Sequence, residues 1–458
     1  MTKRMLKWLA PILFVAACSG TESGTRYQAG VARELVNPDH PVALGGYGLC
    51  IGSPEICRYS TGVHDDLAAS AVALRDAETG EAVVFVGVDT AGLIRWDIDL
   101  IHQAATKAFR EQLGIDFDGT RVVVGSSHSH QAPDTSGMYG PMEGAGRDED
   151  YAAYLRDQVV KAAIRAYQDL RDVNLDWARG TKENTTKDPF SVDHDLYVLR
   201  GRTPAGETVF TLSRWSSHPT TYPETGHVVS SDFIGVYRHE IERRLGGLAV
   251  FFNGAAGSTY PITPVPCTMP DTFPEGQKNP VDGPDEMFNV PLQLYSDCAC
   301  IGSELADAAE AAMQAAVPVA ETGIVARFQR FRYHPTKELL QSFAEMAPMH
   351  WDNAPVEDPE SRITSQFSWV TVGDLDFLTV PGEAFPSLSD SFKAALGRAN
   401  TIVLGLSQDW TGYLLTKKLW DEQTQYVQVQ YHISLSLSPD IESTYIDALQ
   451  ALKAAGTK

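Results

Sequence analysis

Several apolar, strand-like runs of the sequence end in a residue that could bind a metal ion or transfer a proton. The runs and the residues that follow them are 121–124 with His128 and His130, 209–212 with His218, 377–380 with Glu383, 401–404 with Tyr413, and 83–88 with Asp89. Imidazole and carboxylate groups suit Zn²⁺, and a catalytic zinc ion keeps an open position for water. In α/β sheets, ligands gather beyond the carboxyl ends of the strands, so residues far apart in the sequence can meet there. The pattern predicts a metal site that is assembled from several strand ends.

The spacing of His128 and His130 is that of two side chains on one side of an extended chain. Residues i and i+2 of a strand point the same way, so both imidazoles are expected to face one site. The second ring nitrogen of a zinc-bound histidine usually bonds to a carboxylate or a carbonyl group. Asp89 and Asp134 are the candidates for this supporting role.

The elements that must position these residues alternate between strand-like and helix-like patterns. Further strands are predicted at 196–199 and 248–252, and helices at 96–113, 151–170, 233–245, 304–316 and 385–396. Ser231 is expected to cap the helix at 233–245, and Asp232 suits the positive end of its dipole. This order of elements predicts an α/β fold, with a mixed β-sheet flanked by helices and with the ligands at the carboxyl ends of the strands.

The 458-residue chain has 43% apolar residues and a net charge of −22. The apolar share excludes a largely disordered chain. The acidic balance, without a basic run interleaved with aromatic residues, argues against nucleic-acid binding. An anionic substrate would therefore need a local positive centre.

The first residues read as a targeting segment. Residues 1–17 begin with basic side chains and continue with an apolar stretch that is too short to span a bilayer. Ala16-Ala17-Cys18 resembles a bacterial lipobox, which implies a lipoprotein signal peptide at 1–17, a lipidated Cys18 and a tether at 18–26. The expected product is an exported, lipid-anchored protein of the cell envelope, on the periplasmic face or on the surface of the outer membrane if the host is Gram-negative. The alternative is an ordinary secretory signal with an incidental cysteine.

Export to an oxidising compartment favours disulfides for the five remaining cysteines. Cys50 and Cys57 bracket a short loop and can pair. Cys267 can pair with Cys298 or with Cys300, which leaves one thiol over.

Blocks of sequence, in the same order along the chain, resemble the neutral ceramidase family. The blocks are His128-Ser129-His130-Gln131-Ala132-Pro133, Trp215-Ser216-Ser217-His218, Val380-Pro381-Gly382-Glu383 and Gly405-Leu406-Ser407 with Thr411-Gly412-Tyr413. The resemblance covers roughly Tyr27 to Leu449. It implies a ceramidase-like α/β catalytic domain at 27–458, without the C-terminal immunoglobulin-like domain of that family.

The resemblance also implies a set of site residues. His128, His218, Glu383 and Tyr413 would hold one zinc ion per chain. His130 would contact the substrate or polarise its carbonyl group. Either Tyr426 or Tyr431 would stabilise the oxyanion, because the altered spacing leaves both possible.

Two departures from the family pattern affect the mechanism. Ceramidases carry Gly-Asp-x-Ser-Pro, in which the serine is the nucleophile, but here Ser258 stands in place of the aspartate and Tyr260 in place of the serine. A serine mechanism carries over only if Ser258 or Thr259 takes that role. The arginine that the family has near residues 182–187 is absent, with Asn184 or Lys187 in its vicinity.

Together the residues and the resemblance predict a zinc-dependent hydrolase that cleaves an amide bond with a metal-activated water. The substrate would be an acylated small molecule or an N-acyl lipid. Trp351, Trp369, Trp410 and Trp420 could line an acyl path or belong to the core. The alternatives are a metal-dependent esterase, a phosphoesterase in which Asp89 and Asp134 join the histidines around two metal ions, and a catalytically inactive surface binding lipoprotein.

Overall fold

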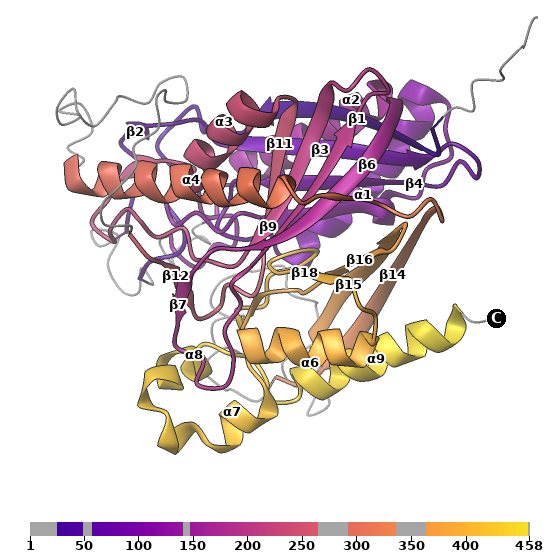
Figure 1. The fold of residues 1–458 in the computed structure, drawn as a ribbon. Coiled ribbons are helices and arrows are strands. Elements are labelled where there is room, and N and C mark those ends of the chain that lie inside the picture. The colour runs from indigo at the N-terminus through magenta and orange to yellow at the C-terminus, as the bar shows by residue number, and fades with distance from the viewer. Residues whose placement is uncertain (1–24, 49–56, 141–146, 264–291, 336–362, 457–458) are drawn as a thin grey trace, which may run out of the picture.

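Two β-sheets lie face to face at the centre of the fold, and helices cover their outer sides (Figure 1). The computed structural model describes residues 25–48, 57–140, 147–263, 292–335 and 363–456. The large sheet has the strand order β11-β9-β8-β6-β1-β3-β4-β5, with β13 paired to β6. The small sheet has the order β14-β15-β16-β18. Both sheets mix parallel and antiparallel pairs, as in β4–β5 and β3–β4.

The strands of the large sheet are β1 (Tyr27–Leu35), β3 (Ala68–Asp76), β4 (Ala82–Val88), β5 (Val122–Ser126), β6 (Arg171–Thr181), β8 (Asp195–Arg202), β9 (Thr208–Trp215), β11 (Leu248–Asn253) and β13 (Val317–Pro318). The small sheet contains β14 (Ile324–Tyr333), β15 (Ile363–Val372), β16 (Leu375–Thr379) and β18 (Thr401–Leu404). Three two-stranded pairs are β2 (Gly62–Val63) with β10 (Val228–Val229), β7 (Asn184–Thr186) with β12 (Thr259–Pro261), and β17 (Glu383–Ala384) with β19 (Tyr413–Leu414).

The helices are α1 (Arg95–Ala108), α2 (Glu149–Gln168), α3 (Phe233–Leu245), α4 (Leu292–Met313), α6 (Pro386–Leu396), α7 (Lys417–Asp421), α8 (Gln430–Ser434) and α9 (Ile441–Ala455). A π-helical turn, Phe109–Leu113, extends α1. None of the helices among the described residues is both long enough and apolar enough to cross a bilayer.

Alternation of side chains along the strands explains why the sheets are covered on both faces. In β4, Val84 and Val86 pack with α1 and α2, whereas Val83 and Phe85 belong to the core between the two sheets. In β16, Phe377 faces that same inner core and Leu378 packs under α6 and α9. Because successive residues of a strand point to opposite faces, both sheets are buried on both sides. The result is four layers, with helices outside and sheets inside.

The predicted fold class is confirmed, and each predicted strand and helix has an observed counterpart. The helix at 233–245 and the strand at 401–404 have the predicted bounds, and the bounds of the others are shifted. The predicted cap of α3 is wrong. Asp232, and not Ser231, caps the helix, because its carboxylate accepts a hydrogen bond from the Phe233 amide. Ser231 instead donates its hydroxyl proton to Asp65 over 2.6 Å.

Three of the cysteines lie in the described part of the chain. Cys298 is a buried free thiol, whereas Cys57 and Cys300 are disulfide-bonded. Cys18, Cys50 and Cys267 lie outside the described residues, as do the predicted signal peptide, most of the tether and Trp351. The lipid anchor and the two pairings therefore stay predictions.

Candidate metal centre

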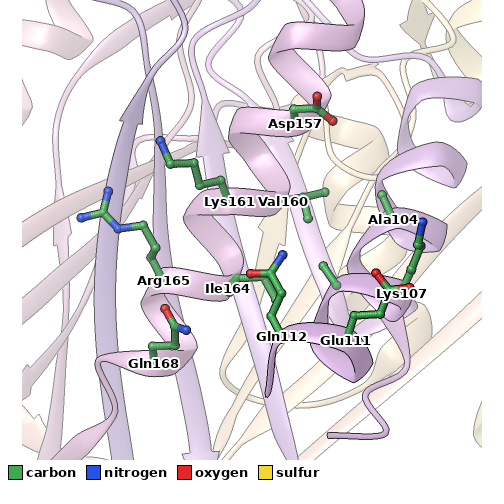
Figure 2. A pocket seen from close by; sticks show the side chains of 11 residues that line it. Ala104, Lys107, Glu111, Gln112, Asp157, Val160, Lys161, Ile164, Arg165 and Gln168 are labelled. Carbon is green, nitrogen blue, oxygen red and sulfur yellow. The ribbon is translucent and has the colours of Figure 1, made fainter. Parts of the chain in front are cut away.

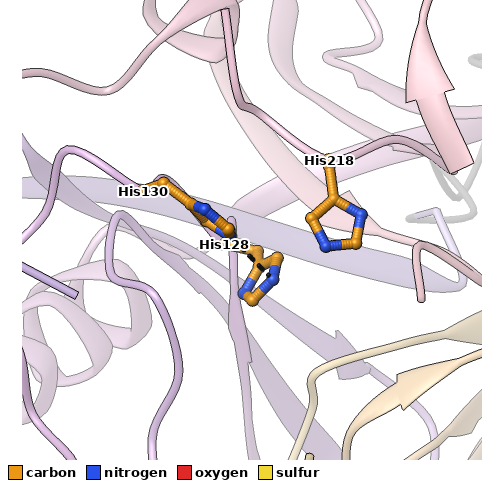
Figure 3. Close-up of side chains that lie close together, drawn as sticks. All are labelled: His128, His130 and His218. Atoms are coloured by element: carbon orange, nitrogen blue, oxygen red, sulfur yellow. Dashed lines mark hydrogen bonds between the residues drawn. The ribbon is translucent and has the colours of Figure 1, made fainter. Parts of the chain in front are cut away.

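Three histidines from two distant parts of the chain meet in the interior of the protein (Figure 3). The ring nitrogens that His128, His130 and His218 offer all lie within 4.8 Å of one another, and all three residues are buried. Nε2 of His128 lies 3.2 Å from Nε2 of His130. His128 and His130 follow β5, and His218 follows β9, as the strand-end argument requires.

Glu383 completes this cluster from the segment that follows β16 of the small sheet. Its Oε2 lies 3.3 Å from Nε2 of His128 and 3.2 Å from Nε2 of His218. Its Oε1 accepts a hydrogen bond from the indole nitrogen of Trp410 over 3.0 Å. Glu383 begins β17, which pairs in parallel with β19, and this register sets Tyr413 directly opposite Glu383. Sequence reasoning names these ligand candidates, but it places Trp410 only among possible acyl-path or core residues.

Backbone hydrogen bonds between the two sheets hold these strand ends in place. The amide of Ser126 donates to the carbonyl of Leu406, and the amide of Gly405 donates to that of Asn253. The amide of Glu383 donates to the carbonyl of Gly412. The loops after β5, β11, β16 and β18 are therefore tied to one another, so four segments that are distant in sequence share one rigid frame.

His128 reaches the centre from a strained backbone and not from an extended one. Its φ angle is +71°, in the left-handed region that a non-glycine residue rarely adopts. Its amide bonds to the carbonyl of Thr90. The prediction that His128 and His130 share one side of an extended segment is thus wrong in its geometry, although the two rings do meet. Such strain costs on the order of 1–3 kcal/mol and is typical of functional sites.

The outer ring nitrogens of two histidines are held by backbone carbonyl groups. Nδ1 of His128 donates to the carbonyl of Ala91, and Nδ1 of His218 donates to that of Thr259 over 3.2 Å. With one proton on Nδ1, the neutral form of each ring has its Nε2 lone pair available for an ion on the side of Glu383. This donor set, two imidazole lone pairs and a carboxylate oxygen in a buried space, fits a divalent cation such as Zn²⁺.

Asp89 and Asp134 do not support the histidines, contrary to the sequence-based expectation. Both carboxylate oxygens of Asp89 bond to the guanidinium of Arg238, at 2.9 and 2.6 Å. Asp134 accepts hydrogen bonds from the backbone amides of Ser136, Gly137 and Tyr139, and so it shapes the loop that follows it. The carbonyl groups of Ala91 and Thr259 accept the Nδ1 protons instead of these aspartates. Any residue has a backbone carbonyl group, so the sequence does not reveal such acceptors.

The charges of the cluster compensate one another. Burial opposes ionisation of Glu383, but His128 and His218 hold its pKa well below the usual value. Burial favours neutral His128, but Glu383 raises the pKa of that imidazole. For His130, burial and the two neighbouring imidazoles act in the same direction and lower its pKa well below the usual value. His130 is therefore a neutral imidazole at pH 7.

His130 has a tightly enclosed ring. The ring of Tyr47 lies edge-on to it at 4.6 Å between centroids. Gly46 has φ +90°, and a Cβ atom at this position would lie 2.3 Å from Cγ of His130. Arg58 donates to the carbonyl of His130 over 3.1 Å. Sequence reasoning did not assign Gly46, Tyr47 or Arg58 a role in the site.

The two candidates for the oxyanion donor lie in different surroundings. Tyr426 packs against Phe190, with ring centroids 5.3 Å apart, at the edge of an apolar cluster. Tyr431 is exposed, and its ring lies 6.2 Å from that of Tyr413. Partial desolvation of its phenol group, followed by the nearby Glu383, raises the pKa of Tyr431 and keeps the phenol protonated. Of the two candidates, Tyr431 is the one whose ring lies beside that of Tyr413.

Ser258 is engaged in the framework of the fold. Its buried hydroxyl shares a 2.9 Å hydrogen bond with that of Thr186, and its carbonyl accepts the amide proton of Lys187. Tyr260, which stands in the place of the family serine, stacks on the ring of His218 with centroids 5.1 Å apart and planes 19° apart. The described residues therefore offer no serine hydroxyl in the role of the family nucleophile at either position.

A separate surface groove of about 610 Å³ lies between α1 and α2 (Figure 2). Lys107, Glu111 and Asp157 are among its charged lining residues. Two further cations of the groove, Lys161 and Arg165, pair with Glu34. None of the lining residues belongs to the histidine cluster, so this groove is distinct from the candidate centre.

The comparisons with known proteins identify the fold. No family model and no curated protein matches the chain. Among solved structures, the crystal structure of neutral ceramidase from Pseudomonas aeruginosa superimposes with a TM-score of 0.73 at 17% sequence identity, over 94% of this chain and 74% of that one. A structure described as ceramidase complexed with C2 gives 0.70 and 16%, over 94% and 75%. The chain has a neutral-ceramidase-like fold, which confirms the fold that the sequence blocks imply.

Proposed function

We propose that this chain is a zinc-dependent hydrolase that cleaves the amide bond of an N-acyl compound. The observation that carries the proposal is the meeting of His128, His218 and Glu383, whose facing atoms lie 3.2–3.3 Å apart in a buried space. The neutral-ceramidase-like fold supports an amide as the bond that is cleaved.

His128, His218 and Glu383 would hold the ion, with Tyr413 as the fourth ligand. When bound, the ion would polarise the acyl carbonyl group and make a water molecule more acidic. Neutral His130 can accept a proton or bond to the substrate through Nε2. The protonated phenol of Tyr431 can donate a hydrogen bond to the oxygen that becomes negative during the reaction.

Water is the proposed nucleophile. The hydroxyl of Ser258 is buried and bonded to Thr186, and Tyr260 stands where the family has its serine. Burial raises the pKa of Tyr260 to about 12, so its phenol is not ionised at neutral pH and is a poor nucleophile. These observations favour direct attack by water over a covalent acyl intermediate.

The substrate is proposed to be an N-acyl lipid or a related fatty-acyl conjugate, as the ceramidase-like fold suggests. We further propose that the protein is exported and held at a membrane through lipidated Cys18. The phosphoesterase alternative loses its basis, because Asp89 pairs with Arg238 and Asp134 bonds to backbone amides.

The test combines elemental analysis with a substrate panel on protein that lacks its first twenty residues. The panel contains N-acyl amides, aryl esters and phosphate monoesters. About one zinc ion per chain together with hydrolysis of N-acyl amides is the expected result. Activity confined to short esters would contradict the amide assignment. A metal-free, folded and inactive protein would instead identify a binding lipoprotein.

A further inference from the structure

A positive side chain without an ionic partner stands beside the candidate centre. Among the described residues, Lys187 makes no ion pair, although acidic residues outnumber basic ones by 59 to 37 in the whole chain. Its Nζ lies 5.1 Å from the centroid of the Tyr260 ring, and its side chain is exposed. A cation over an aromatic face is attracted by the negative face of the ring, also at an exposed site. The ammonium is thus held in place and still accessible.

Tyr260 links this cation to the histidine cluster. One contact of its ring is the ammonium of Lys187, and another is the imidazole of His218, at 5.1 Å between centroids. Thr185, two residues before Lys187, is paired with Tyr260 in the β7–β12 ladder. The amide of Lys187 also bonds to the carbonyl of Ser258 over 3.0 Å. These backbone hydrogen bonds therefore fix the Cα positions of Lys187 and Tyr260 relative to each other.

Two donors in this stack are free to bind a ligand. Within the described residues, neither the ammonium of Lys187 nor the hydroxyl of Tyr260 has a hydrogen-bond partner.

We propose that Lys187 and Tyr260 form a recognition site for a carboxylate group of the substrate. This inference rests on the proposed amide hydrolysis and narrows its substrate class to acidic N-acyl conjugates, such as an N-acyl amino acid. In this arrangement the scissile amide binds at the histidine cluster. The carboxylate of the substrate binds to Lys187, which is separated from His218 by the ring of Tyr260. Lys187 and Tyr260 determine specificity and take no part in the bond cleavage.

The test compares two substrates that differ in charge, N-lauroylglycine and the neutral N-lauroylethanolamine. Lys187→Met should raise KM for N-lauroylglycine about 10- to 100-fold, the weight of one hydrogen bond to a charged group, and leave KM for the neutral amide unchanged. Lys187→Arg keeps the positive charge and should therefore retain a KM for N-lauroylglycine close to that of the wild type. Tyr260→Phe should raise KM for the acid by a smaller factor. In the wild type, added salt should raise KM for the acid only.

Lys418→Met is the matched control, because Lys418 is also an exposed cation over an aromatic ring, 3.8 Å from the centroid of Phe190. This variant should leave both KM values unchanged. Equal KM changes for the two substrates in Lys187→Met, or no change for the acid, would overturn the inference while amide hydrolysis stands.

Failure of the proposed function gives a different result. If neither amide is hydrolysed, calorimetric binding of N-lauroylglycine tests the recognition site by itself. Weaker binding in Lys187→Met by the same factor supports the site, and equal binding in both proteins overturns it.

Discussion

The indole nitrogen of Trp410 donates a hydrogen bond to Oε1 of Glu383 over 3.0 Å. The opposite oxygen of the same carboxylate faces His128 and His218. The indole thereby orients Glu383, so that one oxygen is fixed by the protein and the other is directed to the two imidazoles. The Trp410 ring also stacks with Tyr139, at 6.4 Å between centroids and 8° between planes. Trp410, which the sequence places in the core or on a substrate path, thus supports the carboxylate of the histidine cluster.

Trp410→Phe tests this support. The variant keeps an aromatic ring but removes the donor, so Glu383 loses the bond that orients it. Loss of a group that supports a ligand typically lowers metal affinity about 10- to 100-fold. Titration with a competing chelator measures the change. Trp420→Phe, in the α7 region, is the control and should retain wild-type affinity. Unchanged affinity in Trp410→Phe would contradict the role of the indole.

Tyr431→Phe and Tyr426→Phe form a pair that separates the two oxyanion candidates. Removal of a donor to a developing oxyanion lowers kcat about 10²- to 10³-fold. We expect this loss in Tyr431→Phe only, because Tyr426 packs against Phe190 in an apolar cluster. Steady-state kinetics on an N-acyl amide measures both. The reverse pattern would assign the role to Tyr426.

Gly46→Ala tests the enclosure of His130. The new Cβ would lie 2.3 Å from Cγ of His130, so the ring must move and kcat should fall while the metal content is retained. Gly114→Ala is the matched control, since Gly114 also has a positive φ, +68°, but no atom within 4 Å of a built Cβ. Both variants should lose about 1–2 kcal/mol of unfolding free energy from the left-handed backbone. Equal kcat in the two variants would show that the position of His130 does not matter.

Asp193→Asn tests a buried ion pair beneath β9. Asp193 binds Arg214, with Oδ1 to Nη1 at 3.0 Å, and both side chains are buried. Burial alone would raise the pKa of Asp193, but Arg214 holds it well below the usual value. Removal of one partner leaves an unpaired charge and costs about 3–5 kcal/mol. Asp116→Asn, in the exposed pair with Arg110, should cost less than about 1 kcal/mol.

The ion pair between Asp193 and Arg214 also makes the free energy of unfolding depend on pH, with a sign that follows from the lowered pKa of Asp193. Because the pKa of Asp193 is lower in the folded protein, its contribution to stability is complete above the unfolded-state pKa of about 4 and is lost as the pH falls below it. The free energy of unfolding of Asp193→Asn should therefore depend less steeply on pH between about 5 and 2 than that of the wild type. Parallel curves from urea unfolding would contradict the assignment.

The sequence predicts the ligand candidates because each follows a buried apolar run. Strands such as β5 and β9 are continuous Val-, Leu- or Phe-rich segments with a polar residue just beyond their ends. Both sheets are buried on both faces, which is the condition that produces such runs. In an α/β fold the carboxyl ends of such strands lie close together, so the meeting of the ligand candidates can be predicted without knowing any individual contact.

Other elements and roles could not be read from local sequence. β3 is rich in alanine, and β15 alternates apolar residues with serine and threonine, so neither forms a continuous apolar run. The left-handed φ of His128 depends on bonds to Thr90 and Ala91, which belong to another strand end. The pairing of Asp89 with Arg238 depends on the packing of α3 against the sheet. Each of these is a long-range contact.

Metal content is the measurement that tests the central claim most directly. After reconstitution with Zn²⁺ and removal of excess ion, the wild type should hold about one zinc ion per chain by elemental analysis. His128→Ala and His218→Ala should each lose it, whereas His227→Ala, which changes an exposed histidine, should keep it. Circular dichroism checks that each variant is folded. Equal zinc content in folded wild type, His128→Ala and His218→Ala, or a wild type that binds no zinc, would contradict the account.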